Sequence, residues 1–286
     1  MRILVTGAGG QLGQSLAAAK RPTELQLILL QRKDLDVTDP ISIEKAFSSL
    51  KPDLVINCAA YTAVDQAESE PDFAFAINAD GAGNVAKAAA NVGSPIIHIS
   101  TDYVFDGEKG SPYTEEDSPN PLNVYGASKL AGEREVAAAN RLHIILRTSW
   151  LFGPFGSNFM KTMLRLAKTQ KTIDVVSDQT GCPTSTTAFA AVTLALSSRI
   201  QTGKTENKWG IYHCSATKPT NWASFAAKIF DASEKAEVRT TKINKITSVS
   251  LGAPADRPLY SVLNCDKLRL YYDLSCDSKP RHLPPR

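Results

Sequence analysis

The sequence predicts an α/β protein with a Rossmann-like, doubly wound parallel sheet and a smaller C-terminal lobe. Short apolar runs alternate with helical patterns through the first half of the chain, which is typical of a parallel sheet with helices on both faces. In addition, the glycine-rich segment VTGAGGQLGQ joins the first apolar run to the first helical pattern. A turn of this kind after the first strand is typical of the doubly wound fold.

The expected strands are short apolar runs, and the expected helices are the longer periodic segments between them. Strands are predicted at Arg2–Thr6, Leu25–Leu30, Leu54–Asn57, Ile96–Ser100 and Ile144–Thr148. Helices are predicted at Gln11–Ala19, Ile41–Leu50, Ala67–Val92 and Val124–Asn140. Within the third helix, Pro71, Gly81 and Gly83 predict a short turn followed by a longer helix.

The periodicity weakens after about Leu151. Further elements are predicted as helices near Asn158–Lys168 and Thr187–Ser198, a strand near Gly210–Cys214 and a helix from Asn221. We expect residues 1–150 to form the core. Residues 151–286 are expected to form mainly a lobe on the carboxyl edge of the sheet, which does not fold independently and returns segments to the core.

Composition argues against several classes of protein. Lysine and arginine (32) exceed aspartate and glutamate (29) by only three, and no basic run suggests a nucleic-acid surface. No apolar stretch reaches the roughly 20 residues that cross a bilayer, and the first residues lack a signal-peptide pattern. Neither the cysteines nor the histidines show metal-ligand spacing, so we expect a cytoplasmic protein without a metal ion or disulfide framework. These residues are Cys58, Cys182, Cys214, Cys265, Cys276, His98, His143, His213 and His282. His98 and His143 lie inside apolar strands and are expected to be satisfied core residues.

The glycine turn predicts a dinucleotide site. Gly7, Gly10 and Gly13 have the spacing G-x-x-G-x-x-G between a strand and a helix. Such glycines allow a tight turn, close approach of the backbone to a pyrophosphate, and close packing of the helix on the strand. The amino end of the helix then offers free N–H groups to the phosphates. The alternative is a glycine-rich turn that binds no ligand.

The end of the second strand indicates which dinucleotide is bound. An acidic residue there usually binds the ribose of NAD, whereas arginine accommodates the 2′-phosphate of NADP. Here Arg32 lies between the neutral Gln31 and Lys33, which favours NADPH, with NADH still possible. A basic surface turn is the alternative.

Tyr125 and Lys129 are four residues apart on a predicted helix, so their side chains share one face. A phenol titrates near pH 10, and a nearby ammonium group is expected to lower that value. Thr101, at the carboxyl end of the fourth strand, could bond a substrate carbonyl oxygen from the other side. The three residues predict carbonyl reduction, although a tyrosine and lysine at this spacing can also mark an exposed helix face.

Several ordered segments carry a family resemblance: TGAGGQLG, DLDVTD, NCAAYTAVDQAE, ISTDYVFDG, YGASK, RTSWLFG, DQTGCPTS and DRPLYSVLN. Together they resemble the extended short-chain dehydrogenase/reductase superfamily and, within it, the dTDP-4-dehydrorhamnose reductase family. The resemblance implies reduction of the C4 ketone of dTDP-4-dehydro-L-rhamnose with hydride from NADPH, the last step of dTDP-L-rhamnose synthesis.

The resemblance also implies roles for individual residues. Tyr125 is implied as the general acid and Lys129 as the residue that tunes it and holds the nicotinamide ribose. The implied cofactor contacts are Gly7, Gly10, Gln11, Leu12 and Gly13 at the pyrophosphate, Arg32, Asp36 and Val37 at the adenosine, and Ala59, Ala60, Tyr61 and Thr62 after the third strand. The implied sugar contacts are Thr101, Asp102, Tyr103 and Val64, with Trp150 at the thymine base and Arg257 near the diphosphate.

Alternatives remain for the weaker assignments. Trp150 could be core filling, Asp102 could cap a loop, and Asp36 could start a turn. Arg257 could instead pair with Asp256 or the C-terminal lobe. An alternative function is reduction of another dTDP-4-keto-6-deoxy sugar, or a regulatory subunit that binds NADP without turnover.

Some family members bridge a dimer through Mg²⁺ and two glutamates. Ser15 and Thr187 stand at the matching positions of this chain and are poor ligands for that cation. We therefore expect no bridging metal, and a monomer or a weak homodimer.

Overall fold

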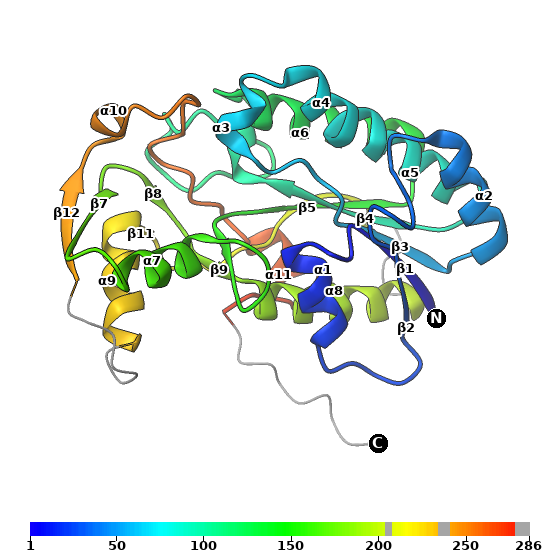
Figure 1. The fold of residues 1–286 in the computed structure, drawn as a ribbon. Coiled ribbons are helices and arrows are strands. Elements are labelled where there is room, and N and C mark those ends of the chain that lie inside the picture. Colours follow the sequence, from blue (N-terminus) through cyan, green and yellow to red (C-terminus); the bar gives the residue numbers. More distant parts are fainter. Residues whose placement is uncertain (204–207, 234–240, 278–286) are drawn as a thin grey trace.

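A six-stranded parallel sheet forms the centre of the molecule in the computed structural model, which describes residues 1–203, 208–233 and 241–277 (Figure 1). The strand order is β10-β5-β4-β3-β1-β2. The strands are β1 (Arg2–Thr6), β2 (Gln26–Leu29), β3 (Leu54–Asn57), β4 (Ile96–Thr101), β5 (His143–Thr148) and β10 (Gly210–His213). Because every neighbouring pair is parallel, all six carboxyl ends lie at the same edge.

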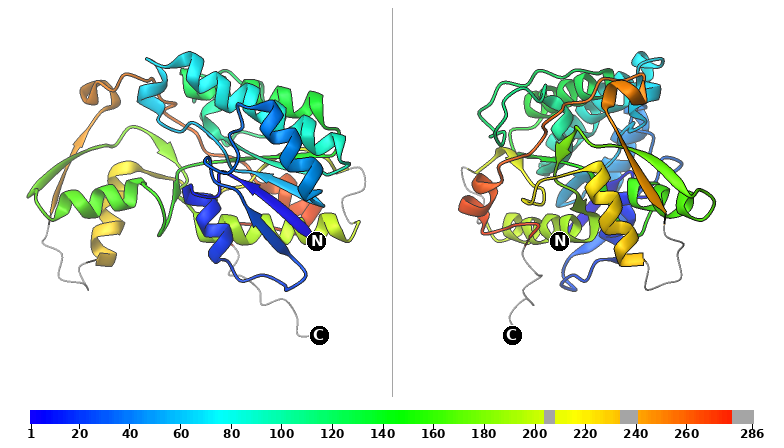
Figure 2. Two further views of the ribbon diagram at one scale, coloured as in Figure 1. Left: turned by 45° about the vertical axis from the view of Figure 1, so that its right-hand side comes forward. Right: turned by 90° about the vertical axis from the view of Figure 1, so that its left-hand side faces the viewer.

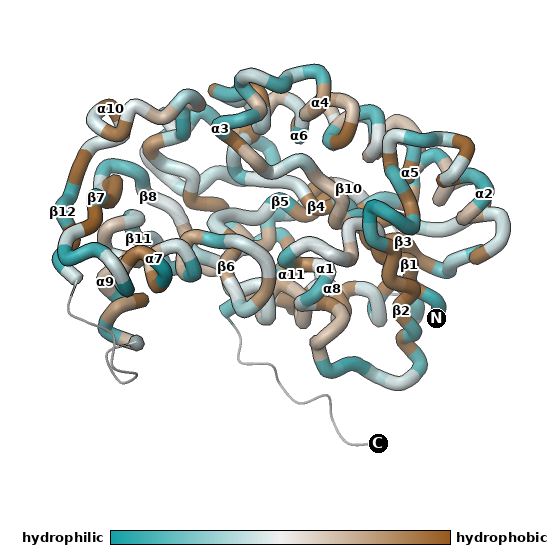
Figure 3. Tube along the Cα trace, viewed as in Figure 1, coloured by the Kyte–Doolittle hydropathy of each residue, from teal (hydrophilic) through white to brown (hydrophobic). Residues whose placement is uncertain are grey.

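Both faces of the sheet are buried, since alternate residues of each strand point to opposite sides. Ile3 and Val5 of β1 pack on one side with Leu16, whereas Leu4 packs on the other side with Phe47. Figure 3 shows the same arrangement as a concentration of hydrophobic segments along β1, β3 and β4. The continuous apolar runs of the sequence are therefore strands covered on both faces.

Two layers of helices cover the sheet (Figures 1 and 2). One layer contains α2 (Pro40–Leu50), α5 (Gly81–Asn91) and α6 (Val124–Ala139), and the other contains α1 (Gln11–Ala18), α8 (Thr186–Gln201) and α11 (Asp266–Tyr272). The predicted fold class is confirmed. The predicted strands and helices of residues 1–150 other than Ala67–Val92 are present, with ends within one residue of those expected.

The segment Ala67–Val92 forms the predicted short turn and longer helix, but Gly81 and Gly83 do not interrupt the longer helix. A short helix, α3 (Val64–Ala67), precedes α4 (Pro71–Phe75), which continues through a π-helical turn (Ala76–Asp80) into α5. Gly81 has ordinary helical backbone angles and does not interrupt the helix. A Cβ atom at this position would lie 2.8 Å from Val37 Cγ2. Gly81 is thus needed for close packing of helix on loop, a contact that local sequence cannot reveal.

The second lobe lies beyond the carboxyl ends of the sheet (Figure 2). It contains α7 (Phe159–Ala167), α9 (Trp222–Ser233) and α10 (Ser248–Leu251). Its strands form three pairs: β6 (Leu151–Phe152) with β9 (Thr184–Ser185), β7 (Thr172–Val176) with β12 (Lys242–Ile246), and β8 (Thr180–Gly181) with β11 (Thr220–Asn221). In contrast, α8, β10 and α11 pack on the main sheet although they follow residue 151.

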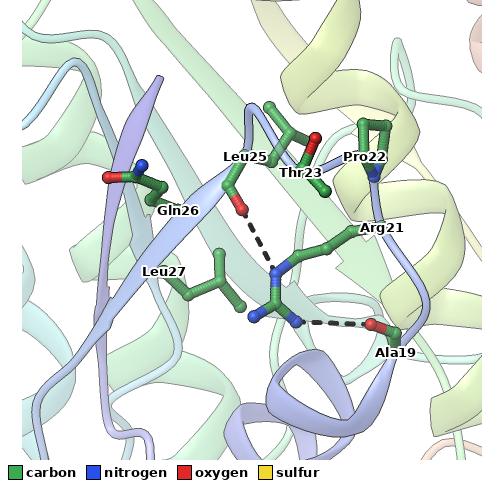
Figure 4. Close-up of a pocket in the computed structure, with 7 residues that line it drawn as sticks. All are labelled: Ala19, Arg21, Pro22, Thr23, Leu25, Gln26 and Leu27. Atoms are coloured by element: carbon green, nitrogen blue, oxygen red, sulfur yellow. Dashed lines mark hydrogen bonds between the residues drawn. The ribbon is translucent and has the colours of Figure 1, made fainter.

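A shallow hollow near the amino end of β2 is lined by residues of the loop between α1 and β2 (Figure 4). Arg21 crosses it and donates to the carbonyl oxygens of Leu25 and Ala19, at 3.2 and 3.3 Å. This hollow lies at the opposite edge of the sheet from the predicted site. The hydrogen bonds of Arg21 therefore stabilise the loop between α1 and β2. Among the described residues, no helix combines the length and apolar character needed to span a bilayer.

Candidate active site

The glycine turn has the geometry of a phosphate cradle. Gly7 has φ +62°, and a Cβ atom there would lie 2.6 Å from the backbone nitrogen of Ala59. A Cβ at Gly13 would lie 2.5 Å from Ala8 Cα. Helix α1 begins at Gln11, and its N-cap Gly10 makes no side-chain cap bond. The N–H groups of the first turn therefore have no capping side chain and fit the pyrophosphate of a dinucleotide.

Gln11 and Leu12 can serve this cradle only through their backbone. The Gln11 amide oxygen accepts from Asn158 Nδ2 at 2.7 Å, and its Nε2 donates to Leu151 O at 3.4 Å. The Leu12 side chain is buried in the core between α1 and the sheet. Gln11 therefore connects the phosphate cradle to the start of the lobe.

Arg32 and Asp36, which were both predicted to contact the adenosine, contact each other. Arg32 Nε lies 3.7 Å from Asp36 Oδ2, and the Arg32 side chain is 67% exposed. Its guanidinium also lies over the Phe73 ring, 5.5 Å from the centroid. Hydrogen bonds from Thr38 lower the pKa of Asp36, and Arg32 lowers it further. Arg32 is thus free to reach solvent beside the turn, while Val37 is buried beneath it.

The segment after β3 passes directly over the glycine turn. Ala59 packs closely against Gly7, and Ala60 and Thr62 are exposed. Tyr61 is held in place by its phenol, which donates to Glu70 Oε2 at 2.8 Å, and by its backbone N–H, which donates to Asn78 Oδ1 at 2.9 Å. These contacts fix the wall of the predicted cofactor cleft.

Tyr125 lies in the first turn of α6, above the carboxyl end of β4. Asn123 caps this helix by accepting from Gly126 N at 2.7 Å. Gly126 allows close packing, since a Cβ there would lie 2.2 Å from Tyr103 O. The Tyr103 and Tyr125 rings meet edge to face with centroids 5.8 Å apart. The capped helix start therefore places the Tyr125 phenol beside Thr101 and against the Tyr103 ring.

Thr101 and Asp102 surround the Tyr125 phenol. Burial raises the pKa of Tyr125 to about 12, a hydrogen bond with Thr101 opposes that rise, and the Asp102 charge adds to it. Asp102 is 1% exposed and accepts from Thr101 Oγ1 at 3.1 Å. Its own pKa is raised by burial to about 7. The structure thus gathers Thr101, Asp102, Tyr103 and Tyr125 in one place, and the phenol holds its proton at neutral pH.

Lys129 differs from the prediction in what it contacts. It is 2% exposed, and its amino group donates to Ile99 O at 2.6 Å and lies 3.3 Å from His98 Nε2. The predicted influence of Lys129 on the Tyr125 pKa is not seen; burial, Thr101 and Asp102 are the groups that shift it. Burial also lowers the pKa of Lys129 to about 8. The lysine is therefore anchored to β4 beneath the tyrosine.

A buried ion pair beneath Lys129 was not predicted. Glu133, one turn further along α6, pairs with Arg147 of β5 at 2.6 Å, and both side chains are at most 3% exposed. Ser100 donates to the same carboxylate, and the Arg147 guanidinium lies 5.1 Å from the Phe105 ring centroid. In the sequence, Glu133 and Arg147 look like ordinary surface charges, because only the fold shows that they face each other.

Trp150 has the left-handed backbone angle φ +47° and stacks on Trp222, with ring centroids 3.5 Å apart. Trp222 Nε1 donates to Gln179 Oε1 at 3.0 Å. Gly181 is closely packed on Trp150, since a Cβ there would lie 2.5 Å from the indole. A role for Trp222 at the site was not predicted. In the sequence it stands out only as an aromatic residue at the start of a predicted helix.

Arg257 does not pair with the Asp256 side chain, but its Nη1 donates to the carbonyl oxygen of Ala255, in the C-terminal part of the chain, at 3.0 Å. Its guanidinium pairs with Asp65 Oδ2 at 2.9 Å, and Asp65 follows Val64 in α3. Arg257 also hydrogen-bonds the Tyr103 side chain. Asp256 contacts Asn123 instead, through its backbone oxygen at 2.6 Å. Arg257 therefore links its own segment of the chain to α3, beside the rings of Tyr103 and Tyr125.

The positions predicted not to hold a metal have other contacts. The Ser15 hydroxyl is buried and donates to Thr186 Oγ1 at 2.9 Å, whereas Thr187 is exposed. Within the described ranges, no group of three or more potential ligands has a geometry that could hold a metal ion, and His282 lies outside them. The cysteines are scattered in sequence, yet the thiols of Cys214 and Cys276 lie 3.4 Å apart.

Comparisons with known proteins identify the family of this chain. A family model described as the RmlD substrate binding domain matches residues 1–282. A dTDP-4-dehydrorhamnose reductase of Sinorhizobium fredii is 44% identical over 268 residues, which cover 94% of this chain and 90% of the relative. The chain belongs to the dTDP-4-dehydrorhamnose reductase family.

Solved structures of the family have the same fold. A dTDP-4-dehydrorhamnose reductase of Clostridium acetobutylicum superposes with a TM-score of 0.87 at 43% identity, over 94% of this chain and 92% of that one. A dTDP-4-dehydrorhamnose reductase of Bacillus anthracis, in complex with NADP, gives the same TM-score at 41% identity, again over 94% and 92%. The resemblance seen in the motifs thus extends over nearly the whole chain.

Proposed function

We propose that this protein reduces the C4 ketone of dTDP-4-dehydro-L-rhamnose to dTDP-L-rhamnose, with hydride supplied by bound NADPH. The observation that carries the proposal is the placement of the Tyr125 phenol. It lies at the carboxyl end of β4 with Thr101 at its oxygen and Lys129 one helical turn away. Family membership and the uncapped start of α1 support the same reaction.

Tyr125 is proposed as the proton donor. Ketone reduction places negative charge on the sugar oxygen, so the donor must carry its proton before the reaction. The buried phenol, with a pKa of about 12, meets that requirement across the physiological range. Thr101 orients the phenol and can bond the same sugar oxygen, which makes the developing alkoxide easier to form.

The remaining predicted roles are part of the proposal. The backbone of Gly7, Gly10, Gln11, Leu12 and Gly13 would hold the pyrophosphate, with Ala59, Ala60, Tyr61 and Thr62 forming the adjacent wall. Arg32 would bind a 2′-phosphate, which favours NADPH over NADH, and Asp36 with Val37 would flank the adenine. Asp102, Tyr103, Val64 and Trp150 of the core, together with Arg257 from residues 151–286, would contact the nucleotide sugar.

The decisive experiment is a coupled pair of measurements on the purified protein. Oxidation of NADPH is followed at 340 nm (the absorbance of the reduced nicotinamide) with and without dTDP-4-dehydro-L-rhamnose, and NADPH binding is measured by calorimetry. Substrate-dependent oxidation that yields dTDP-L-rhamnose supports the proposal. Tight NADPH binding without oxidation would instead indicate a regulatory subunit, and oxidation only with another dTDP-4-keto-6-deoxy sugar would change the substrate.

A further inference from the structure

Two cysteine thiols meet next to the carboxyl end of β10. Cys214 follows β10 directly, and Cys276 comes shortly after the end of α11. Their sulfur atoms lie 3.4 Å apart, although the two positions are separated by 62 residues of sequence. Both are free thiols that pack with the same hydrophobic cluster, which includes Tyr212 and Leu268. A disulfide bond places its sulfurs at about 2.0 Å, so only a small approach separates this pair from a covalent bond.

The backbone on each side of the thiol pair is held in place. The Cys214 N–H donates to Arg147 O at 2.8 Å, which continues the pairing of β10 with β5. Next to Cys276, the Asp277 carboxylate accepts from the Thr217 backbone N–H at 3.2 Å and also from the Thr217 hydroxyl. The segment that carries Cys276 is therefore hydrogen-bonded to the residues just after Cys214. Packing and hydrogen bonds together hold the two sulfurs in contact.

The two thiols differ in their access to solvent. Cys214 is 1% exposed, and its hydrogen bond with Cys276, together with burial, raises its pKa well above the usual value. Cys276 is only partly buried, so a small oxidant can reach its sulfur. An accessible thiol with a protected thiol beside it is the arrangement of an oxidisable cysteine and its resolving partner.

A third thiol lies close to this pair and has a different contact. Cys265, just before α11, accepts from the Ser215 backbone N–H at 3.3 Å. It is near enough to Cys214 and Cys276 for their charges to interact. Because its sulfur is bonded to the backbone, Cys265 is the natural competitor against which a link between Cys214 and Cys276 has to be tested.

We propose that Cys214 and Cys276 form a reversible oxidation site, at which hydrogen peroxide converts the two thiols to a disulfide. The Cys276 thiolate attacks one peroxide oxygen, the O–O bond breaks, and a sulfenic acid and a hydroxide ion form. The Cys214 sulfur then attacks the Cys276 sulfur, the S–O bond breaks, and a second hydroxide ion leaves as the S–S bond forms. The two thiol protons convert both hydroxide ions to water. Two thiols thus lose two electrons, and one hydrogen peroxide gives two water molecules.

The disulfide would link the end of β10 to the segment after α11. It closes a loop of 62 residues, and a cross-link over a loop of this length restricts the unfolded chain. We therefore expect the oxidised protein to melt about 5–10 °C higher than the reduced protein. In a reducing compartment the bond would form during exposure to peroxide and be reversed afterwards.

Peptide mapping of the full-length protein tests the proposal. The protein is treated with a small excess of hydrogen peroxide, remaining thiols are alkylated under denaturing conditions, and linked peptides are identified by mass spectrometry without reduction. We expect one cross-link, between Cys214 and Cys276, which dithiothreitol reverses, while Cys58 and Cys182 are recovered alkylated. Recovery of all five thiols, or a link from Cys276 to Cys265, would overturn the proposal. This result depends on no variant.

Cys214→Ala separates the two chemical steps. In this variant the sulfenic acid of Cys276 has no partner, and dimedone, which reacts with sulfenic acids, should trap several-fold more of it than in wild type. Cys58→Ala is the matched control, because Cys58 is also partly buried and packs against the same cluster. It should keep the cross-link and show wild-type trapping. Equal trapping in Cys214→Ala and wild type would contradict the resolving role of Cys214.

Thermal unfolding tests the effect of the disulfide on the fold. Peroxide should raise the melting temperature of wild type and of Cys265→Ala by about 5–10 °C, and dithiothreitol should reverse the rise. Cys276→Ser should show no rise, because the accessible thiol is missing. A cross-linked wild-type protein that melts no higher than the reduced form would show that the bond does not stabilise this part of the fold.

Discussion

The indole rings of Trp150 and Trp222 lie parallel, with centroids 3.5 Å apart and planes 6° apart. Trp222 is held in place by its bond to Gln179 and by Phe159, whose ring centroid lies 4.5 Å away. It is therefore a fixed wall behind Trp150. A nucleotide base that contacts Trp150 must use the surface that Trp222 leaves open.

Replacement of this wall should weaken nucleotide binding. In Trp222→Leu, Trp150 loses its stacked neighbour, and we expect dTDP to bind about tenfold more weakly, within the range of one base–aromatic stack. Calorimetric titration with dTDP measures the loss, and the NADPH affinity should be unaffected. Trp209→Phe is the control, since Trp209 packs against the main core. Equal dTDP affinity in Trp222→Leu and wild type would show that the pair does not support the base.

Tyr125→Phe should abolish turnover and preserve the fold. Removal of the proton donor is expected to lower kcat by about 10² to 10⁴-fold. The dissociation constant of NADPH should change little, because the phenyl ring still packs on Tyr103. Stopped-flow measurement of NADPH oxidation tests the rate, and activity comparable to wild type would remove Tyr125 from its role.

Arg32→Ala should reduce selectivity for NADPH. A lost charged hydrogen bond costs about 1.5–3 kcal/mol, so the KM for NADPH should rise by about ten- to a hundredfold while that for NADH stays constant. Lys33→Ala, one residue further along the same exposed turn, is the matched control. An equal rise in the KM values for NADPH and NADH would show that Arg32 serves only the surface turn, through its contact with Asp36.

Asp102 should make stability depend on pH. Burial raises its folded pKa from 3.8 to about 7, so between these values the folded protein binds a proton that the unfolded chain has lost. Stability from this group is therefore lost as pH rises from about 4 to about 7, by about 4 kcal/mol at most. Urea unfolding at pH 5 and pH 8 should show that Asp102→Asn loses less stability over this interval than wild type. Identical pH profiles would place the carboxyl in a solvated environment.

The buried pair of Glu133 and Arg147 should be costly to break. Glu133→Gln leaves an uncompensated guanidinium in the core, and the free energy of unfolding should fall by about 3–5 kcal/mol. The combined change Glu133→Leu with Arg147→Met should recover most of that loss. Asp266→Asn breaks the exposed pair with Arg269 and should change stability by less than about 1 kcal/mol. A similar, small loss in the single buried variant would indicate that water reaches the pair.

The sequence by itself determined the elements and the local chemistry of the core. Short apolar runs between the helical patterns located β1, β3, β4 and β5. Strands that are buried on both faces must be continuously apolar, so each run marks one strand. The glycine spacing located the turn before α1, and the Tyr125–Lys129 spacing predicted two side chains on one helix face. These signals are local, because each depends on residues within one or two turns of the chain.

Only the tertiary structure decided which distant groups meet. Gly81 serves packing against Val37 and breaks no helix, and Arg257 pairs with Asp65 across 192 residues of sequence. His98 looked like a satisfied core residue, yet the sheet and α6 bring its ring to the amino group of Lys129. Spacing along the chain carries no information about such contacts. Their energies depend on burial and on the direction of each donor, and both arise only when the strands and helices pack together.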